Sequence, residues 1–202
     1  MRKLVVILDP AHGRNTPGKC SPDGQHREYL WSRMLEDRVR IILQERGFCV
    51  QQTTMSINEP GLSVRKRAAE KIKGDLKLLV SLHNNAAGSD GKWHKATGFE
   101  VWTTVNVTNS DICADYFIEQ LRKDFPKVAC RLNSPGYLNK DKEANFTVLT
   151  GKGYMAVLVE WLFQDNKEDV VLLQSDEMNN RFAESICSAI EDIDVHFSRK
   201  QL

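Results

Sequence analysis

Residues 3–8 read Lys-Leu-Val-Val-Ile-Leu and run directly into Asp9-Pro10-Ala11-His12-Gly13. The first part is a continuous apolar run, which is typical of a central strand covered on both faces. The second part changes abruptly to proline, small residues and a histidine, as expected where a strand ends in a loop. The segment therefore predicts a buried first strand that delivers His12 to one edge of a sheet.

Apolar patterns of helical and strand period alternate along the rest of the chain. Helical spacing predicts helices over 28–46, 63–73, about 109–125 (with Asn109 or Ser110 as the cap) and about 177–193. Apolar runs predict further strands over 48–54, 77–82, 98–103, 145–149 and 154–160. The stretch 127–144 is irregular and polar, with a turn expected at Pro135-Gly136.

This alternation implies an α/β fold. We expect a twisted, mostly parallel or mixed central sheet that is flanked by helices on both faces. No internal repeat or linker divides the 202 residues, so one domain with a core over about 3–193 is predicted.

Composition excludes several classes of protein. There are 28 basic and 27 acidic residues, and the densest basic stretch, Arg65-Lys66-Arg67, is interpreted as the solvated face of a helix. We therefore expect no nucleic-acid partner. The 5 cysteines are odd in number, scattered and without a CxxC pair, which indicates reduced thiols and excludes a cysteine-type zinc site.

The N-terminal segment resembles a signal peptide only superficially. Its apolar run is too short and reaches Asp9 and Pro10 instead of a small-residue cleavage site. No other segment is long and apolar enough to span a membrane, so membrane insertion is not expected.

Ionisable side chains are predicted where the functional crevice of an open α/β sheet lies, beyond the carboxyl ends of the strands. His12 follows the first strand, His83 follows a second buried strand, Glu160 ends a third, and Glu28 opens the first helix. Two imidazoles and one carboxylate suit a catalytic zinc with an open position, and a further carboxylate can move a proton. Taken singly, each residue has a simpler structural explanation, such as a helix-dipole partner for Glu28. Spacing alone does not establish a metal site.

Several separated blocks follow one another in an order that is known from one family. They are Leu8–Gly13, Gly24–Leu43, Leu62–Ala69, Val80–Ala86, Gly98–Val101, Glu143–Leu149, Ala156–Glu160, and Phe163, Asn166 and Glu168-Asp169. Over about Lys3 to Ile193 the chain resembles the zinc-dependent N-acetylmuramoyl-L-alanine amidases of the amidase type 3 group, which includes autolysins and phage lysins. The first block resembles the family's DPGHGG segment, and Val80–Ala86 resembles its SIHANA-like segment. The resemblance implies a single catalytic amidase domain over residues 1–202.

The resemblance also implies an activity and roles for residues. The reaction is hydrolysis of the amide between N-acetylmuramic acid and the L-alanine of peptidoglycan stem peptides. His12, Glu28 and His83 would hold one catalytic Zn²⁺, which activates water and polarises the lactyl carbonyl. Glu160 would act as general base and then protonate the departing alanine nitrogen. Three polar residues are candidates for binding the substrate: Asn84, Asn85 and Asn145.

The expected partner is peptidoglycan, at the bacterial cell wall in the periplasm or outside the cell. Some regulated relatives carry a long helical insert that blocks the metal. Because residues 127–144 are too short and turn-rich for such an insert, we expect no obligatory activator.

The chain departs from the family pattern at three places, and each departure has an expected structural effect. Ala11 replaces the usual glycine before the histidine, which the backbone accepts if φ is negative there. Trp161-Leu162 replaces a small pair, and its bulk beside Glu160 is expected to narrow the cleft. Gln164-Asp165 replaces the usual Leu-Ser and removes no ligand. The remaining histidines are interpreted as exposed or surface residues: His26, His94 and His196.

Three alternatives stay open from the sequence. A zinc peptidase that cuts within stem peptides would use the same metal chemistry. A catalytically inactive wall-binding module would require loss of a ligand or of the base, yet all four positions are present. A nucleotide-binding α/β protein is disfavoured, because the chain lacks both a GxGxxG after its first strand and a P-loop.

Overall fold

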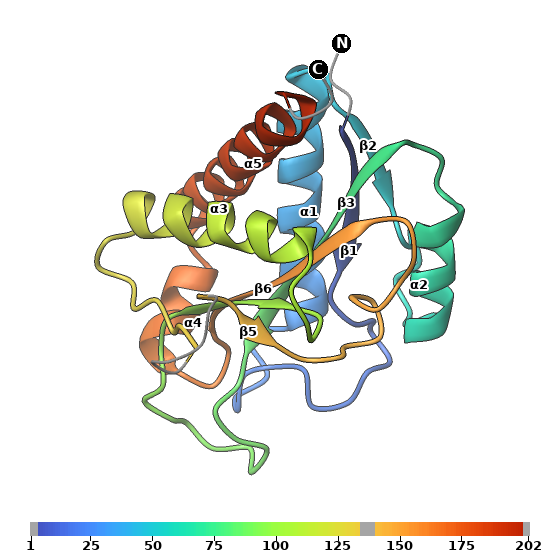
Figure 1. The fold of residues 1–202 in the computed structure, drawn as a ribbon. Coiled ribbons are helices and arrows are strands. Elements are labelled where there is room, and N and C mark those ends of the chain that lie inside the picture. The colour runs from blue at the N-terminus through green and yellow to red at the C-terminus, as the bar shows by residue number, and fades with distance from the viewer. Residues whose placement is uncertain (1–3, 134–139, 200–202) are drawn as a thin grey trace.

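The computed structural model describes residues 4–133 and 140–199, which form a central six-stranded mixed sheet (Figure 1). The order across the sheet is β2-β1-β3-β6-β4-β5. β1 runs parallel to β2 and β3, β3 runs parallel to β6, and β4 is antiparallel to β6 but parallel to β5. The strands are β1 (Leu4–Pro10), β2 (Cys49–Gln52), β3 (Leu76–Asn85), β4 (Phe99–Thr103), β5 (Lys142–Glu143) and β6 (Met155–Phe163).

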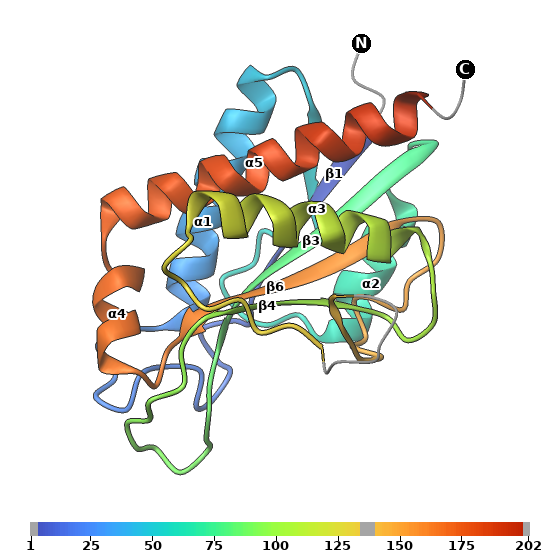
Figure 2. The same cartoon turned by 60° about the vertical axis from the view of Figure 1, so that its left-hand side comes forward.

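Helices cover both faces of this sheet, so the predicted α/β class with a mixed sheet is confirmed (Figures 1 and 2). α1, α3 and α5 form a layer on one face, and α2 lies on the other. The bounds are α1 (Glu28–Glu45), α2 (Leu62–Lys71), α3 (Asn109–Asp124), α4 (Lys167–Leu173) and α5 (Asp176–Arg199). Within the described residues, no helix combines the length and apolar character needed to cross a membrane.

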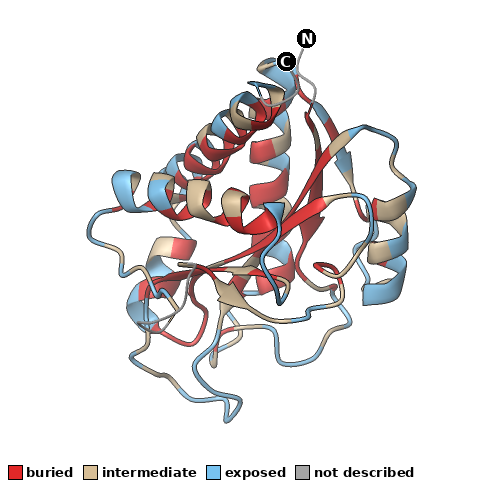
Figure 3. Ribbon diagram, in the orientation of Figure 1, coloured by how far each residue is buried: buried red, intermediate tan, exposed pale blue. Residues whose placement is uncertain are grey.

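The core divides between the two faces because side chains alternate along each strand. On β6, Val157, Val159 and Trp161 pack into the larger cluster with α1, α3 and α5, whereas Ala156 and Leu158 belong to a smaller cluster on the α2 side. Figure 3 shows the buried strands and the buried inner faces of α1 and α5. The α2 side of the sheet carries less apolar cover, and that is the side on which the polar site is built.

Four local predictions differ from the structure. Lys142–Glu143, within the stretch 127–144 predicted to be irregular, form the short strand β5 by pairing with β4. Residues 145–149 form turns and not a strand, because Phe146 and Leu149 donate backbone hydrogen bonds to the nearby carbonyls of Ala144 and Phe146. The cap of α3 is Thr108, whose hydroxyl accepts from the Ser110 N–H at 3.1 Å, one residue earlier than expected. α4 is missing from the sequence prediction because its seven residues are too few to show a helical period. The turn expected at Pro135-Gly136 lies outside the described residues.

The helix layer contains one buried acid away from the site. Glu36 of α1 is only 3% exposed and accepts a hydrogen bond from Gln52 Nε2 at 2.9 Å. Burial raises the pKa of Glu36 from 4.5 to about 7, and the negative charges of Asp9 and Asp37 add to the effect. The folded protein therefore keeps this proton to a higher pH than the unfolded chain does.

Between these two pKa values the folded state binds more protons, so stability falls as pH rises through this window. We expect Glu36 alone to lower the free energy of unfolding by up to about 3 kcal/mol across the rise in its pKa from 4.5 to about 7. Glu36→Gln removes the titrating group and keeps an oxygen for Gln52. Urea unfolding at about pH 5 and about pH 8 should show that the free energy of unfolding of the variant, relative to that of the parent, is higher at the higher pH. Glu45→Gln, on the exposed side of α1, is the control, and a parallel pH dependence of Glu36→Gln and parent would contradict the assignment.

Candidate metal centre

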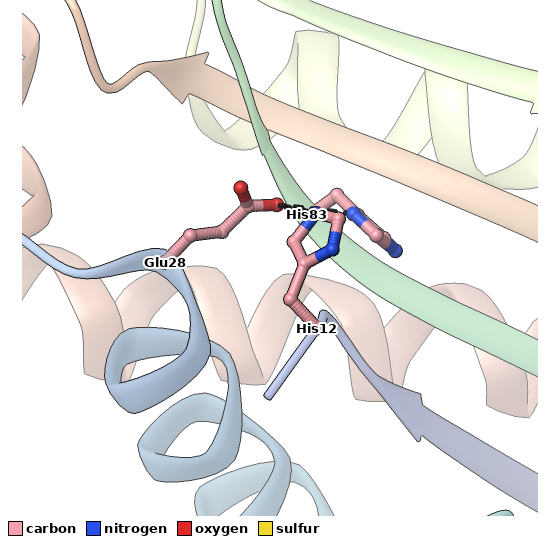
Figure 4. A group of neighbouring side chains, drawn as sticks. All are labelled: His12, Glu28 and His83. Atoms are coloured by element: carbon pink, nitrogen blue, oxygen red, sulfur yellow. Dashed lines mark hydrogen bonds and ion pairs between the residues drawn. The ribbon is translucent and has the colours of Figure 1, made fainter. Parts of the chain in front are cut away.

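Three side chains that are far apart in the sequence meet at the carboxyl edge of β1 and β3 (Figure 4). Nε2 of His12 lies 3.3 Å and Nδ1 of His83 lies 3.0 Å from the same oxygen, Oε1 of Glu28. The potential ligand atoms of the three residues all lie within 4.8 Å of one another. The structure thus brings together the residues that the sequence singles out as metal ligands.

Each of the three comes from the end of a different element. His12 follows the last residue of β1 and adopts φ +50°, a left-handed conformation that turns the chain away from the strand. Glu28 is the first residue of α1, and His83 lies near the end of β3. Ala11 is not among the residues with positive φ, which agrees with the tolerance expected for the missing glycine.

Glu28 is fully buried, yet its surroundings favour the carboxylate form. Burial by itself would raise its pKa, but the hydrogen bonds and positive charge of His12 and His83 outweigh it and hold the pKa of Glu28 well below its usual range. The Asn84 backbone N–H donates to Oε1 at 3.2 Å and Gln164 Nε2 donates to Oε2 at 3.2 Å. A buried carboxylate beside two imidazoles is a ligand set that catalytic zinc takes, with outer hydrogen bonds that orient the ligand. These residues fit a divalent metal ion.

Glu160 faces this cluster from the neighbouring strand. In the β3–β6 pairing it is the Cα partner of His83. Burial raises the pKa of Glu160 to about 7; the charge of His83 opposes this effect, and those of Glu28 and Glu100 add to it. Among the described residues its Oε2 is buried and has no hydrogen-bond partner. A carboxylate oxygen without a protein partner is available to a water or a substrate.

The expectation that Trp161 narrows the cleft is wrong. Trp161 has no exposed surface and stacks on Phe182, with ring centroids 4.1 Å apart. Because neighbouring residues of a strand point to opposite faces, Trp161 enters the helix layer whereas Glu160 faces the cleft.

The cleft at this edge has a volume of about 350 Å³ and is lined by His12, Glu28, His83 and Glu160. Asn145 and Asn84 also line it. Asn145 is exposed, whereas the amide of Asn84 is already engaged: its Oδ1 lies 2.8 Å from His26 Nε2, and its Nδ2 donates to the carbonyl of Trp161 at 2.8 Å. Asn85 is not part of the lining, and its Oδ1 accepts from the backbone N–H of Ala86.

The interpretation of His26 as an exposed residue is also wrong. His26 is 4% exposed and is held by Asn84, so the loop before α1 is fastened to the end of β3. Sequence alone misses this role because the partner is 58 residues away. His94 and His196 are half-buried, and their ring nitrogens lie 2.9 Å from Asp90 Oδ1 and 3.0 Å from Tyr116 Oη.

Arg65 is the clearest correction to the sequence interpretation. It is 1% exposed instead of solvated, and its guanidinium pairs with Asp9 at 3.0 Å and with both oxygens of Glu59 at 2.9 and 2.8 Å. It also donates to the carbonyls of Pro10 at 2.5 Å and His12 at 2.8 Å. Arg33 of α1 donates to the same His12 carbonyl at 2.9 Å. Two guanidinium groups therefore hold the turn that presents the His12 ring.

The fold and this cluster define a class: single-domain α/β proteins whose mixed sheet presents a His–Glu–His group at its carboxyl edge. Residues 6–192 match the family model described as N-acetylmuramoyl-L-alanine amidase. The chain belongs to this amidase family.

Known proteins agree with this assignment. The chain is 26% identical to the amidase AmiC of Neisseria meningitidis serogroup B over 94% of its own length and 52% of AmiC, and 30% identical to the endolysin of Bacillus phage SPP1 over 96% and 66%. It thus spans about half to two thirds of the length of these curated relatives. An amidase structure from Clostridium difficile 630 has the same fold, with a TM-score of 0.81 at 22% identity over 95% of this chain and 97% of that one. CwlD of Clostridioides difficile, solved in complex with the lipoprotein GerS, gives 0.79 at 19% identity over 94% and 97%.

The Arg65 pairing predicts a large effect of substitution. Arg65→Gln leaves the buried Asp9 without its cationic partner, so we expect a loss of about 3–5 kcal/mol in the free energy of unfolding. Urea unfolding measures the loss. Arg67→Gln, an exposed arginine two residues along α2, is the matched control and should change stability by less than about 0.5 kcal/mol. Equal effects of the two substitutions would contradict the structural role.

The Glu28 contacts predict graded effects on metal affinity. His83→Ala removes one of the three candidate ligands and should abolish tight zinc binding, whereas Gln164→Leu removes only the hydrogen bond to Glu28 and should weaken zinc binding by about tenfold. Competition with a fluorescent zinc chelator, on protein first stripped of metal, measures both. Gln174→Leu, exposed at the end of α4, is the control. Parent affinity in the His83→Ala protein would remove His83 from the ligand set.

Proposed function

We propose that this chain is a zinc-dependent amidase that hydrolyses the bond between N-acetylmuramic acid and L-alanine in peptidoglycan. One observation carries the proposal: His12, Glu28 and His83 place their ligand atoms within 4.8 Å of one another in a cleft that also contains the unpartnered oxygen of Glu160. Membership of the amidase family supports the choice of bond.

The division of labour follows from the positions of these residues. His12, Glu28 and His83 would hold the zinc ion, which supplies Lewis-acid chemistry by acidifying water and polarising a carbonyl. Glu160 takes a proton from the attacking water and returns it to the departing alanine nitrogen, so one carboxyl group serves as base and then as acid. Burial raises the pKa of Glu160 to about 7, and a divalent cation beside it would lower this pKa, which favours the carboxylate that acts as the base.

Polar groups along the cleft are proposed to position the substrate. Asn145 Oδ1 accepts from Thr104 Oγ1 at 3.0 Å and from the Val105 N–H at 3.4 Å, which leaves its amide N–H groups for a substrate carbonyl. Asn84 lines the cleft with its amide engaged, so its contribution is to hold the end of β3 as well as to contact the substrate. Asn85 is proposed as a contact for the outer part of the substrate.

The proposed place of action is the bacterial cell wall, and the proposed partner is peptidoglycan alone. An accessory lipoprotein is bound to CwlD in its structure. For this chain we propose activity without an obligatory activator, because the stretch 127–144 is short for a blocking helix. Purified protein that degrades peptidoglycan only after addition of a bacterial extract would contradict this.

The central test is Glu160→Gln, assayed beside the parent on purified peptidoglycan. Loss of the base should lower the rate by about 10²–10⁴-fold while zinc content is kept. Glu177→Gln, an exposed acid on α5, is the matched control and should keep the parent rate. A near-parent rate for Glu160→Gln would sink the general-base assignment.

Mass spectrometry of the parent's products identifies the bond that is cut. New N-terminal L-alanine supports the amidase, and cleavage between stem residues would establish the peptidase alternative. Parent protein that binds zinc but releases no product would favour an inactive wall-binding module.

A further inference from the structure

A second pocket adjoins the catalytic cleft on the side of the loop between His12 and Glu28. Its volume is about 240 Å³, and its lining includes Arg14, Lys19, Arg27 and Tyr29. Lys19 lines the catalytic cleft as well, so the two hollows share a wall. The pocket therefore lies where a substrate that extends from the metal centre would enter it.

The basic side chains of this pocket are not paired with a carboxylate among the described residues, although Lys19 also lines the catalytic cleft, where its charge lowers the pKa of Glu160. Arg14, Lys19 and Arg27 are all exposed, and within the described part of the chain their side chains have no hydrogen bond or ion pair. The described lining includes no aspartate or glutamate. This differs from Arg46 and Arg65, for example, each of which pairs with two carboxylates. Three unpaired cations around one hollow form a field that attracts an anion.

The backbone fastens these cations to the metal centre. The Glu28 N–H donates to the Lys19 carbonyl at 3.2 Å, and Arg27 immediately precedes Glu28. Arg14 follows His12 by two residues, so their Cα atoms are at most about 7 Å apart. The Arg14 N–H donates to the Ile57 carbonyl at 2.8 Å, and the Thr16 N–H donates to the Gly13 carbonyl at 2.9 Å. An anion bound here is held at a fixed place beside the catalytic centre.

We propose that Arg14, Lys19 and Arg27 form a subsite that binds a carboxylate of the stem peptide. The inference rests on the proposed amidase function. It adds on which side of the metal centre the stem peptide lies and which charge the substrate carries there. The lactyl carboxyl group of N-acetylmuramic acid is consumed in the amide bond, and the neighbouring sugar is neutral, so the carboxylates of the substrate lie on its peptide. A cationic pocket on one side of the metal centre therefore places the peptide on that side and favours stems with free carboxylates over amidated stems.

The test compares peptidoglycan that differs only in this charge. Walls are first stripped of phosphate polymers, and half of the sample then has its carboxyl groups converted to methylamides with carbodiimide and methylamine. Initial rates of release of N-terminal alanine give kcat/KM for the zinc-loaded parent, Arg14→Gln, Arg27→Gln and the double variant, because Arg14 and Arg27 are not part of the described lining of the catalytic cleft. Arg122→Gln, an exposed arginine on α3 that is not part of the described lining of either hollow, is the matched control.

We expect the parent and Arg122→Gln to prefer the untreated wall. Each lost charge should reduce that preference by up to about fivefold, through KM, with the rate on methylamidated wall unchanged. Equal parent rates on the two walls, or equal losses on both walls in the variants, would overturn the subsite. The same comparison is made on a parallel pair of walls that keep their phosphate polymers, and a preference found only with that pair would show that the anion is a phosphate and would overturn the subsite too. Parent protein that cleaves neither wall would overturn the proposed function, and the subsite with it.

Discussion

The buried guanidinium of Arg65 is the constraint on which the geometry of the site depends. A cation that is 1% exposed has lost its hydration and requires compensation from the protein. The compensation comes from Asp9 at the end of β1, from Glu59 in the loop before α2, and from the carbonyls of Pro10 and His12. Because all of these must surround one planar group, the path of the chain beyond β1 is fixed, and with it the left-handed turn at His12.

Asp9 connects the buried Arg65 to three strands of the sheet. Its Oδ2 accepts from the Ser81 hydroxyl of β3 at 2.7 Å, and its Oδ1 accepts from the hydroxyl of Thr53, which follows β2. One carboxylate thus joins the ends of β1, β2 and β3 to α2 through Arg65. His83 lies two residues beyond Ser81, on the same face of β3, so the network that holds His12 also sets the position of the second imidazole.

The sequence predicts a helix or a strand well where the apolar residues recur at the spacing of that element. β1, β3 and α1 are found close to their expected bounds, and α5 extends beyond them, because their buried residues repeat at the strand or helical period. The segment 145–149 fails because its apolar Val148 and Leu149 cover the second face of the sheet from turns, and burial of apolar residues does not require a strand. The sequence singles out His12, Glu28 and His83, which the structure brings together, because each one lies at or just beyond the end of a predictable element.

The residues whose roles the sequence does not predict are those held by buried polar contacts with other parts of the chain. Arg65 and Arg67 are the same residue type in one basic stretch, yet one is at the centre of an ion network and the other is solvated. His26 and Gln164 look like loop residues, and their roles rest on Asn84 and Glu28, which are distant in the chain or belong to other elements. The pattern of charged residues in a sequence gives their positions along the chain. It does not tell which residue the fold places beside each of them.

The family match and the charge distribution carry different information about this protein. The match covers residues 6–192, and solved neighbours at 19–22% identity share the fold, so the fold persists while most side chains change. The loop from Arg14 to Arg27 lies between two of the metal-centre residues and keeps its backbone bonded to one of them. Within the described residues, the side chains of Arg14, Lys19 and Arg27 in this loop are exposed and make no hydrogen bond or ion pair, so these three residues can change with little cost to the fold. In the proposed assignment, buried residues at the sheet edge would fix the chemistry, and the exposed cations beside it would select among substrates.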